Sequence, residues 1–311
     1  MHVIDGHSHI GNDTFWKNVG DIQEYLKNLE KKGISEAFIM SVACPTIERN
    51  DQKVSLLIHG EKNIENDHLR IIKNKDGSIT KELIKKNDNP YKEANDLIYN
   101  IVTNNSSPIK LNYVPLIHPY YYSYEDFISN LKRGAKMFKI HGIAGGVLPD
   151  NISDEFFEMI ESLGVSLIIH TDYSKTNDLQ MSNSPDAWLN RLSKYNIDVY
   201  LAHAARLSEN AISTINQDSR YMVGIGPDLL LSRPGRNYID TNHYLETCLE
   251  KFNINKMIFD IDYPWNIISN QDYSLDWDSI DRINSLLSKN EQEIVYNKNI
   301  EKITKGKEVR K

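Results

Sequence analysis

The sequence predicts a (β/α)8 barrel of the TIM type, distorted by one long insertion. Two observations predict it: short apolar runs alternate with amphipathic stretches along the chain, and most of the histidines stand where such a run ends. Apolar runs separated by helical patterns are typical of a parallel sheet with crossover helices. A chain of 311 residues has the length of one such barrel.

Eight apolar runs are candidates for the barrel strands. They are residues 3–4, 37–43, 111–117, 135–140, 165–169, 198–202, 221–225 and 256–261. Helical patterns lie between most of them, at residues 22–32, 124–134, 153–164, 184–196, 207–217 and 242–252. Ser153 and Ser184 are predicted N-caps, with Pro185 at a first helical position and Gly164 at a helix end. Eight strand–helix units in one chain favour the barrel.

Residues 45–92 do not fit the alternation. This stretch is rich in lysine and asparagine, and residues 70–84 within it predict a hairpin that turns at Asp76-Gly77. We expect one barrel domain over residues 1–305, with the insertion after the second strand and a charged tail at 306–311. Long loops in barrels often serve as lids or contact surfaces, so the insertion is a candidate homodimer interface.

Composition excludes several classes of partner. The net charge of −7 argues against nucleic acid and anionic membranes, which attract basic surfaces. No apolar run approaches the roughly 18 residues of a membrane helix, and the first residues lack a signal-peptide pattern. Cys44 and Cys248 lie too far apart for a metal or redox motif. We therefore expect a cytoplasmic protein with a small-molecule substrate.

The stretch VIDGHSHIG at residues 3–11 places His7 and His9 directly after the first apolar run. On a strand, residues two apart share a face and lie roughly 6.6 Å apart, so both imidazoles can bind one ion. Other strands end in a similar way, with His118, His141, His170 and His203 after the third to sixth and Asp260 and Asp262 after the eighth. Barrel enzymes build their active sites at these C-terminal strand ends.

Strand alternation allows every one of these groups to face the barrel interior. The expected partners on one face are Asp5 with His7 and His9, Lys139 with His141, Ile168 with His170, Leu201 with His203, and Ile258 with Asp260 and Asp262. Imidazole and carboxylate suit Zn, Mn or Fe(II), and the lack of cysteine ligands argues against a closed structural zinc site. An open position on such an ion would lower the pKa of a bound water toward ~7.

The motifs DGHSHIG, FKIHG, IIHTD, LAHAAR and FDIDYPW together resemble the amidohydrolase superfamily. They are most similar to the amidohydrolase-related branch that contains aminocarboxymuconate-semialdehyde decarboxylase and related hydrolases. The resemblance covers nearly the whole chain except residues 45–92. It implies that His7, His9, His170 and Asp262 bind one divalent metal, zinc first, with Mn or Fe as alternatives. It also implies that His203 is an acid–base residue and that Asp262 accepts the proton of the attacking water.

Lys139 leaves the number of ions open. In a binuclear branch of the superfamily, a lysine on the fourth strand is carboxylated and bridges two metals, and Lys139 would match it. The KxH form at Lys139 and His141 is more similar to the mononuclear branch, where the lysine stays free. A free lysine buried in the barrel would need a partner such as Asp5 or Asp260. His118 and His141 are candidates to line the site or to serve a second metal.

Two departures from the family pattern bear on the substrate. Asp260 stands where the branch usually has glycine, and Ala204-Ala205-Arg206 follows His203 in place of two glycines. Arg206, together with Arg233 and Arg236 after the seventh strand, is a candidate to bind a carboxylate or phosphate.

The leading functional hypothesis is a metal-dependent hydrolase in which activated water attacks an amide, lactone or ester carbonyl. One alternative is non-oxidative decarboxylation of a small, for instance aromatic, carboxylic acid at the same site. Another is a binuclear hydrolase that uses carboxylated Lys139. A third, outside enzymes, is a non-catalytic metal-binding barrel.

Overall fold

The protein is described by a computed structural model that covers residues 1–13, 19–49, 52–55, 69–74, 76, 78–85, 88–171, 183–226, 241–264 and 275–305. Within these ranges, eight parallel strands coincide with the eight predicted apolar runs. They are β1 (Ile4–Asp13), β3 (Glu36–Ser41), β8 (Lys110–Tyr113), β9 (Met137–His141), β10 (Ser166–His170), β11 (Val199–Leu201), β12 (Tyr221–Gly224) and β13 (Met257–Ile258). The predicted strands are therefore confirmed.

Backbone hydrogen bonds close these strands into a ring. On one side, the Lys139 amide donates to the Pro115 carbonyl and the Ile117 amide donates to the Lys139 carbonyl, each over 2.9 Å, which joins the chain after β8 to β9. On the other side, β1 bonds to the segment after β13, through Gly6 to Phe259 and Asp262 to His7, both at 2.9 Å. We call this contact between β1 and residues 259–263 the closure seam. The predicted TIM barrel is confirmed.

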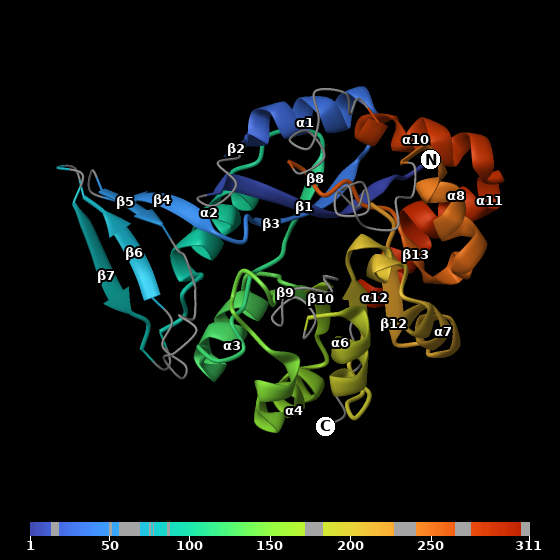
Figure 1. The fold of residues 1–311 in the computed structure, drawn as a ribbon. Helices are drawn as coiled ribbons and strands as arrows, with labels where there is room; N and C mark the ends of the chain where they lie inside the picture. The colour runs from blue at the N-terminus through green and yellow to red at the C-terminus, as the bar shows by residue number, and fades with distance from the viewer. Residues whose placement is uncertain are drawn as a thin grey trace.

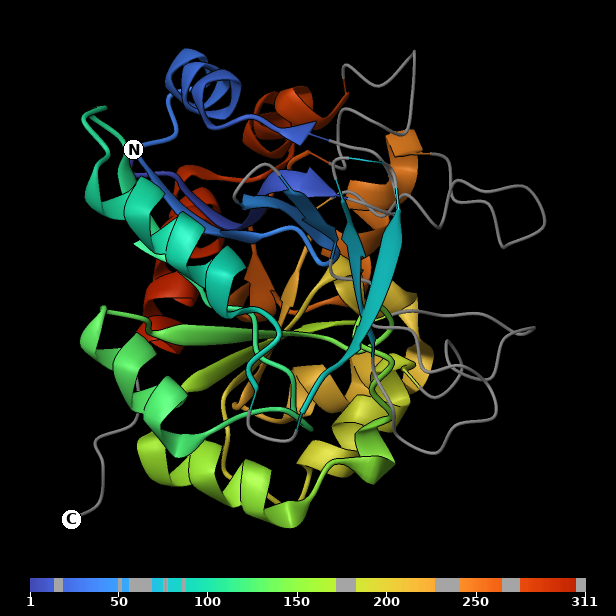
Figure 2. The same ribbon diagram turned by 90° about the vertical axis from the view of Figure 1, so that its left-hand side faces the viewer.

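Helices surround the ring of strands (Figure 2). They are α1 (Ile22–Lys31), α2 (Lys92–Thr103), α3 (Tyr124–Lys132), α4 (Asp154–Leu163), α6 (Pro185–Leu192), α7 (Glu209–Gln217), α8 (Thr241–Lys251), α10 (Leu275–Leu286), α11 (Lys289–Glu293) and α12 (Asn299–Thr304). The Ser153 and Ser184 hydroxyls accept from the amides of Phe156 and Ala187, as predicted for N-caps. Gly164 ends α4 at a φ of +63°, a conformation that glycine adopts without strain. No helix of the described part has the length and apolarity needed to cross a membrane.

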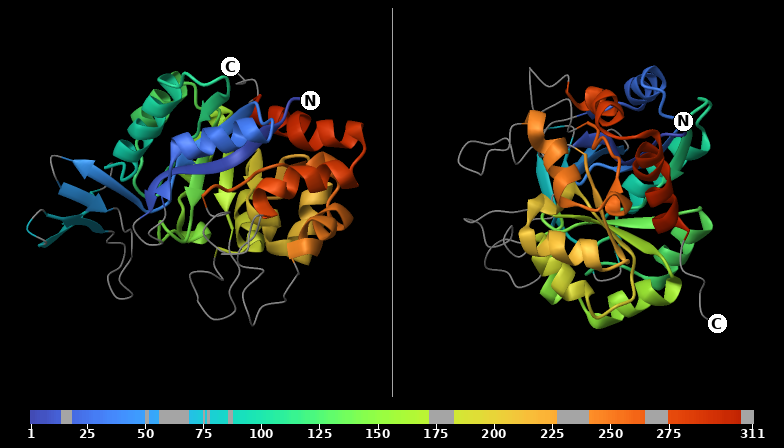
Figure 3. Two further views of the ribbon diagram at one scale, coloured as in Figure 1. Left: turned by 90° about the horizontal axis from the view of Figure 1, so that it is seen from above. Right: turned by 90° about the vertical axis from the view of Figure 1, so that its right-hand side faces the viewer.

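The insertion forms an antiparallel sheet that extends away from the barrel (Figures 1 and 3). Strands β6 (Leu69–Lys73) and β7 (Ile79–Leu83) pair as the hairpin predicted at Asp76-Gly77. Two further strands, β4 (Pro45–Arg49) and β5 (Gln52–Ser55), were not predicted. The tip of β1 pairs with β4 and with the short β2 (Val19–Gly20), so the inserted sheet continues from the first barrel strand.

The prediction that Asp5 faces the barrel interior with His7 is wrong. Ile4 packs inside the ring with Phe38 and Met40, whereas Asp5 accepts a hydrogen bond from Tyr25 on the outer helix α1. The pairing of β1 with β3 shifts register between Asp5 and Ser8. A β-bulge adds one residue and reverses the alternation, so His7 and His9 point inward although Asp5 points outward.

The predicted pairing of His203 with an inward Leu201 is also wrong. Leu201 packs in the outer apolar layer between strands and helices, and Tyr200 is the interior residue of β11. His203 still reaches the interior because the chain leaves strand geometry directly after β11. Residues 203–207 (η2) all have positive φ values, between 46° and 60°, which form a left-handed turn.

Candidate metal centre

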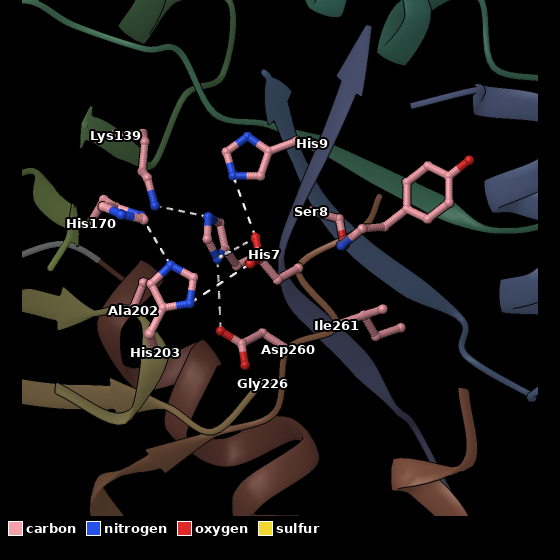
Figure 4. A network of polar contacts seen from close by, with 12 residues as sticks. His7, Ser8, His9, Lys139, His170, Ala202, His203, Gly226, Asp260 and Ile261 are labelled. Carbon is pink, nitrogen blue, oxygen red and sulfur yellow. Dashed lines mark hydrogen bonds and ion pairs between the residues drawn. The ribbon is translucent and has the colours of Figure 1, made fainter. Parts of the chain in front are cut away.

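Three buried side chains converge at the C-terminal end of the barrel. His7, His9 and Asp262 each offer a ligand atom within 4.8 Å of the others. Asp262 Oδ1 lies 3.6 Å from His9 Nε2 and 3.7 Å from His7 Nδ1. The two histidines come from the first strand and the aspartate from the segment after the last, so the closure seam assembles the group. Figure 4 shows His7 at the centre of this polar network.

Local backbone geometry fixes each of the three groups. The bulged β1 turns His7 and His9 to one face. His9 Nδ1 lies 2.7 Å from the Ser41 carbonyl and must donate to it, which leaves the Nε2 lone pair directed at Asp262. Asp262 has a φ of +55°, and its amide donates to the His7 carbonyl over 2.9 Å. The backbone hydrogen bond thereby joins two of the prospective ligand residues directly.

Asp5 stabilises the closure seam through hydrogen bonds on the outer side of the strands. Its carboxylate accepts from the Ile261 amide at 2.9 Å, the His7 amide at 3.2 Å, the Ser8 hydroxyl at 2.5 Å and the Tyr25 hydroxyl. Burial raises the pKa of Asp5 to about 6, against the effect of these donors. Asp5 therefore holds the first and last strands together, and its side chain does not face the barrel interior as predicted.

A row of histidines extends from Asp262 across the next strands. Asp262 Oδ2 lies 3.7 Å from His203 Nδ1, and His203 Nε2 lies 3.0 Å from His170 Nδ1. The His170 ring stacks on His141, with centroids 3.8 Å apart. His170, the predicted fourth ligand, thus lies behind His203 and outside the group of three described above. Its role as a ligand stays a prediction.

Lys139 and Asp260 flank His7 on opposite sides (Figure 4). Lys139 Nζ lies 2.8 Å from His7 Nε2, so its partner is this imidazole rather than the carboxylates of Asp5 or Asp260. Burial lowers the pKa of Lys139 to about 7 against the attraction of Asp262 and Asp260. Asp260 Oδ2 lies 3.8 Å from His7 Nδ1 and accepts from Tyr200, and burial raises the pKa of Asp260 to about 7.

The remaining candidate residues lie around this centre. His118 has both nitrogens engaged by backbone, because Nδ1 accepts from the Tyr120 amide and Nε2 faces the Gly145 carbonyl at 2.9 Å. Arg206 is buried, and its Nε donates to the Thr171 carbonyl over 2.8 Å. Arg233 and Arg236 lie outside the described residues, as does the tail at 306–311.

The chemistry of this donor set fits a divalent cation. Burial lowers the pKa of His9 to about 3 and the pKa values of His7 and His203 well below their usual range, so all three imidazoles are neutral and have lone pairs to offer. Burial raises the pKa of Asp262, whose Oδ1 is buried and has no hydrogen-bond partner among the described residues. Ligand atoms around a tetrahedral ion lie about 3.4 Å apart for bonds of about 2.1 Å, close to the separation of His9 and Asp262.

Comparisons with known proteins find solved structures of similar fold but no match by sequence. Neither a protein-family model nor a curated protein matches the chain. A solved structure described as a probable 2-pyrone-4,6-dicarboxylic acid hydrolase from Acinetobacter baumannii, with citric acid bound, superposes with a TM-score of 0.59 at 14% identity, covering 98% of this chain and 100% of that one. A TIM-barrel protein from Bordetella bronchiseptica gives 0.60 at 10% identity, with 97% and 98% covered.

An enamidase described as a member of the amidohydrolase superfamily gives a TM-score of 0.58 at 12% identity over 97% of this chain and 66% of that one. At such identities the likeness establishes the fold. The fold that this protein shares with these structures is the TIM barrel that the sequence predicted.

Tyr200 is the site residue that sequence reasoning missed. It is fully buried inside the ring and donates to Asp260. The alternation of side chains along β11 could have identified it. The inward-facing positions were instead counted back from His203, which lies beyond the regular strand. Strand alternation counted within 199–201 alone places Tyr200 on the face opposite the outward-packing Val199 and Leu201.

Proposed function

We propose that the protein is a metal-dependent hydrolase of the amidohydrolase type that acts on an amide, lactone or ester carbonyl of a small molecule. The observation that carries this proposal is the arrangement around Asp262. One of its oxygens faces His7 and His9, and the other faces His203. A metal-ligand group and an acid–base residue thus share one carboxylate at the catalytic end of the barrel.

One divalent ion, zinc first with Mn or Fe(II) as alternatives, would polarise the carbonyl and acidify water. His7, His9 and Asp262 would hold it, and His170 is the proposed fourth ligand. Asp262 can take a proton from the attacking water and pass it from Oδ2 to His203 Nδ1, 3.7 Å away. His203 then protonates the leaving group. Both groups are buried, which keeps bulk water from competing for the proton.

Arg206 supports a substrate that carries a carboxylate. Its guanidinium is buried at the strand ends and anchored through Nε, and its charge lowers the pKa of His203 and of His170, after the larger effect of burial. A planar guanidinium suits a carboxylate because it donates two parallel hydrogen bonds. A substrate of this class would also be required for decarboxylation, so the products must distinguish the two reactions.

Lys139 supports one ion rather than two in this proposal. Its amine is already paired with His7 Nε2, deep in the barrel. Carboxylation would make it a bridging ligand and admit a second metal. The stoichiometry of bound metal therefore decides between the mononuclear and the binuclear hydrolase.

The first experiment measures metal per chain by elemental analysis, on protein prepared without chelator in medium containing Zn, Mn and Fe. We expect about one ion, lost in His9→Ala and retained in Lys139→Met. His2→Ala is the matched control, because His2 binds Glu36 and Ser35 at the other end of β1. Two ions, one of them lost in Lys139→Met, would support the binuclear hydrolase instead. An ion-free wild type would overturn the proposal.

The second experiment screens lactones, amides and esters with and without a carboxylate, together with aromatic carboxylic acids. We expect hydrolysis of a carboxylated substrate, with turnover reduced at least about 100-fold in Asp262→Asn and in His203→Asn, the range for loss of a general acid–base group. Release of CO₂ without hydrolysis would identify a decarboxylase. Turnover that is insensitive to both substitutions would refute catalysis at this site.

A further inference from the structure

Tyr91 is a buried tyrosine at the start of α2, and the proposed reaction does not use its hydroxyl. Its side chain is 1% exposed and packs in the interior cluster of the barrel together with Met40 and Leu116. The hydroxyl is buried and has no hydrogen-bond partner among the described residues. A buried polar group without a partner is rare in folded proteins, so this hydroxyl calls for an explanation.

The fold fixes Tyr91 at the catalytic end of the barrel. As a helix that leads into the parallel strand β8, α2 runs opposite to the strands, so its first turn lies where the strands end. The Tyr91 amide donates to Asn89 Oδ1 over 3.0 Å, and the Tyr91 carbonyl accepts from the Asn95 amide over 2.8 Å. The Asn95 side chain exchanges two hydrogen bonds with the backbone of Leu116, at 2.8 and 2.9 Å. The backbone of Tyr91 is therefore held firmly above the strand ends.

Aromatic rings surround the Tyr91 side chain on the side of the candidate metal centre. The His118 ring is stacked with Tyr91, with centroids 6.5 Å apart and an angle of 27° between the planes, and the Tyr121 ring lies 4.9 Å from His118. Because both nitrogens of His118 are engaged by the backbone, this imidazole does not serve the Tyr91 hydroxyl.

The same rings adjoin the row of histidines at the metal centre. Leu116 pairs with Lys139 in a parallel bridge, so His118 lies level with His141, two residues further along each chain segment. His141 stacks on His170. The cluster that holds Tyr91 lies over β3 and β8, whereas Arg206 follows β11. Tyr91 and Arg206 therefore approach the centre from nearly opposite sides of the ring of strands.

The surroundings of the Tyr91 hydroxyl indicate which kind of group it can bind. Burial raises the pKa of Tyr91 above its usual value, and the neighbouring Cys44 and Asp13 raise it further, so the hydroxyl keeps its proton and can donate. Asp13 is itself buried and accepts from the Cys44 amide over 3.3 Å. Since a carboxylate lies close by, a neutral oxygen is a better partner for Tyr91 than an anionic one.

We propose that Tyr91 is a specificity-determining residue: its hydroxyl donates a hydrogen bond to a neutral oxygen of the substrate, a carbonyl or hydroxyl oxygen remote from the bond that is cleaved. A substrate with this oxygen satisfies the buried donor, whereas an analogue without it leaves the donor unpaired and is discriminated against. Arg206 would bind the carboxylate of the same molecule from the other side. The inference rests on the proposed function, because it requires the substrate to bind at this end of the barrel.

The decisive experiment compares ligands that differ by one oxygen. The probes are benzoate, 3-hydroxybenzoate and 4-hydroxybenzoate, titrated into the metal-loaded protein in a calorimeter. The two hydroxyl positions sample two distances from the carboxylate. We expect at least one hydroxybenzoate to bind about 2- to 12-fold more tightly than benzoate, the range for one neutral hydrogen bond. In Tyr91→Phe this preference should vanish, and the affinity for benzoate should not change.

Tyr221→Phe is the matched control. The Tyr221 hydroxyl is also buried and has no hydrogen-bond partner among the described residues, but its ring packs in the outer apolar layer, on β12. This variant should keep the wild-type preference. Urea unfolding then distinguishes recognition from a structural role. The midpoint of Tyr91→Phe should be no lower than that of the wild type, because the described structure shows no bond of this hydroxyl within the chain.

Tyrosine labelled with carbon-13 at Cζ reports the contact directly, with the Tyr91 and Tyr221 signals assigned by their loss in the two phenylalanine variants. We expect the preferred hydroxybenzoate to shift the Tyr91 signal and leave the Tyr221 signal in place. Equal affinity of the wild type for the three acids, a preference that persists in Tyr91→Phe, or a lower unfolding midpoint of Tyr91→Phe would overturn the inference. The hydrolase proposal would survive each of these results, since bound metal and turnover in Asp262→Asn and His203→Asn decide it.

Discussion

The left-handed turn that follows His203 provides the sharpest test of the backbone geometry. Ala204 and Ala205 both have a φ of +46°, and both methyl groups are fully buried. A non-glycine residue in this conformation costs roughly 1–2 kcal/mol. Replacing Ala205 by glycine removes that strain. It also loses ~0.8 kcal/mol of methyl burial and about 0.5–1 kcal/mol through the greater freedom of glycine in the unfolded chain. The terms nearly cancel.

We therefore expect Ala205→Gly to leave the free energy of unfolding within about 1 kcal/mol of the wild type. Ala211→Gly is the matched control, since Ala211 is equally buried but lies in the regular helix α7. With no strain to relieve, it should lose about 2 kcal/mol from helix propensity and methyl burial. Urea unfolding followed by circular dichroism measures both. Equal losses in the two variants would refute the left-handed turn, and with it our explanation of how His203 enters the site.

Three further predictions concern the seam, the protein's acid stability and the metal. Tyr25→Phe should lose about 1.5–3 kcal/mol of unfolding free energy, because a hydrogen bond to the Asp5 carboxylate disappears, and a loss no larger than that of Tyr221→Phe would contradict this role. Burial raises the pKa of Glu36, but hydrogen bonds from Lys110 and Asn112 outweigh it and hold the pKa below its usual 4.5. Because the folded pKa lies below the unfolded one, this stabilisation is present above about pH 4.5 and is lost as pH falls through the folded pKa. The difference in unfolding free energy between wild type and Glu36→Gln should therefore shrink on acidification. A difference that does not change between about pH 3 and 7 would disprove this prediction. Removal of bound metal by chelator should lower the unfolding free energy by about 2.7 kcal/mol relative to protein with free metal at 100 times its dissociation constant. Asp262→Asn should show no such loss, and an equal loss there would argue that the chelator acts elsewhere.

The strand positions and the histidines at their ends could be read from the sequence for a simple physical reason. Strands of a parallel barrel are buried on both faces, so they appear as continuous apolar runs, and a polar residue that ends such a run marks the catalytic edge. This is why His7, His9, His203 and Asp262 were predicted to lie near one another, and the structure brings them together.

Side-chain direction was less predictable, because period-two counting assumes an uninterrupted strand. The bulge between Asp5 and Ser8 reverses the alternation in β1, and the left-handed turn redirects His203 after β11. Neither feature has a strong sequence signal: no glycine or asparagine marks the left-handed turn, and the pattern around Gly6 reads as a regular strand. For this reason Asp5 was assigned to the wrong face of its strand and Tyr200 was not recognised as a residue of the site.

The insertion shows the same limit for strand detection. The hairpin of β6 and β7 was predicted because Asp76-Gly77 is a turn signal between two apolar-containing runs. Strands β4 and β5, with sequences PTIER and QKVS, each contain a single large apolar residue. Their pairing depends on the tip of β1, a contact that no local pattern reports. That the insertion mediates a homodimer stays a prediction.

The place of the candidate metal ligands has a consequence for how the barrel is held closed. The two histidines belong to β1, whereas the aspartate belongs to the segment after the last strand. Hydrogen bonds join these segments across the whole length of the barrel sequence: Asp5 and Ile261 are 256 residues apart, and Ser8 and Tyr263 are 255 residues apart. Backbone bonds and Asp5 join these segments, but the seam lacks the regular ladder seen between β9 and β10. An ion bound by His7, His9 and Asp262 would cross-link the seam directly, so its binding energy would oppose local opening there before it opposed global unfolding. Amides at Gly6, His9 and Asp262 should therefore gain the most protection from hydrogen exchange when metal is added.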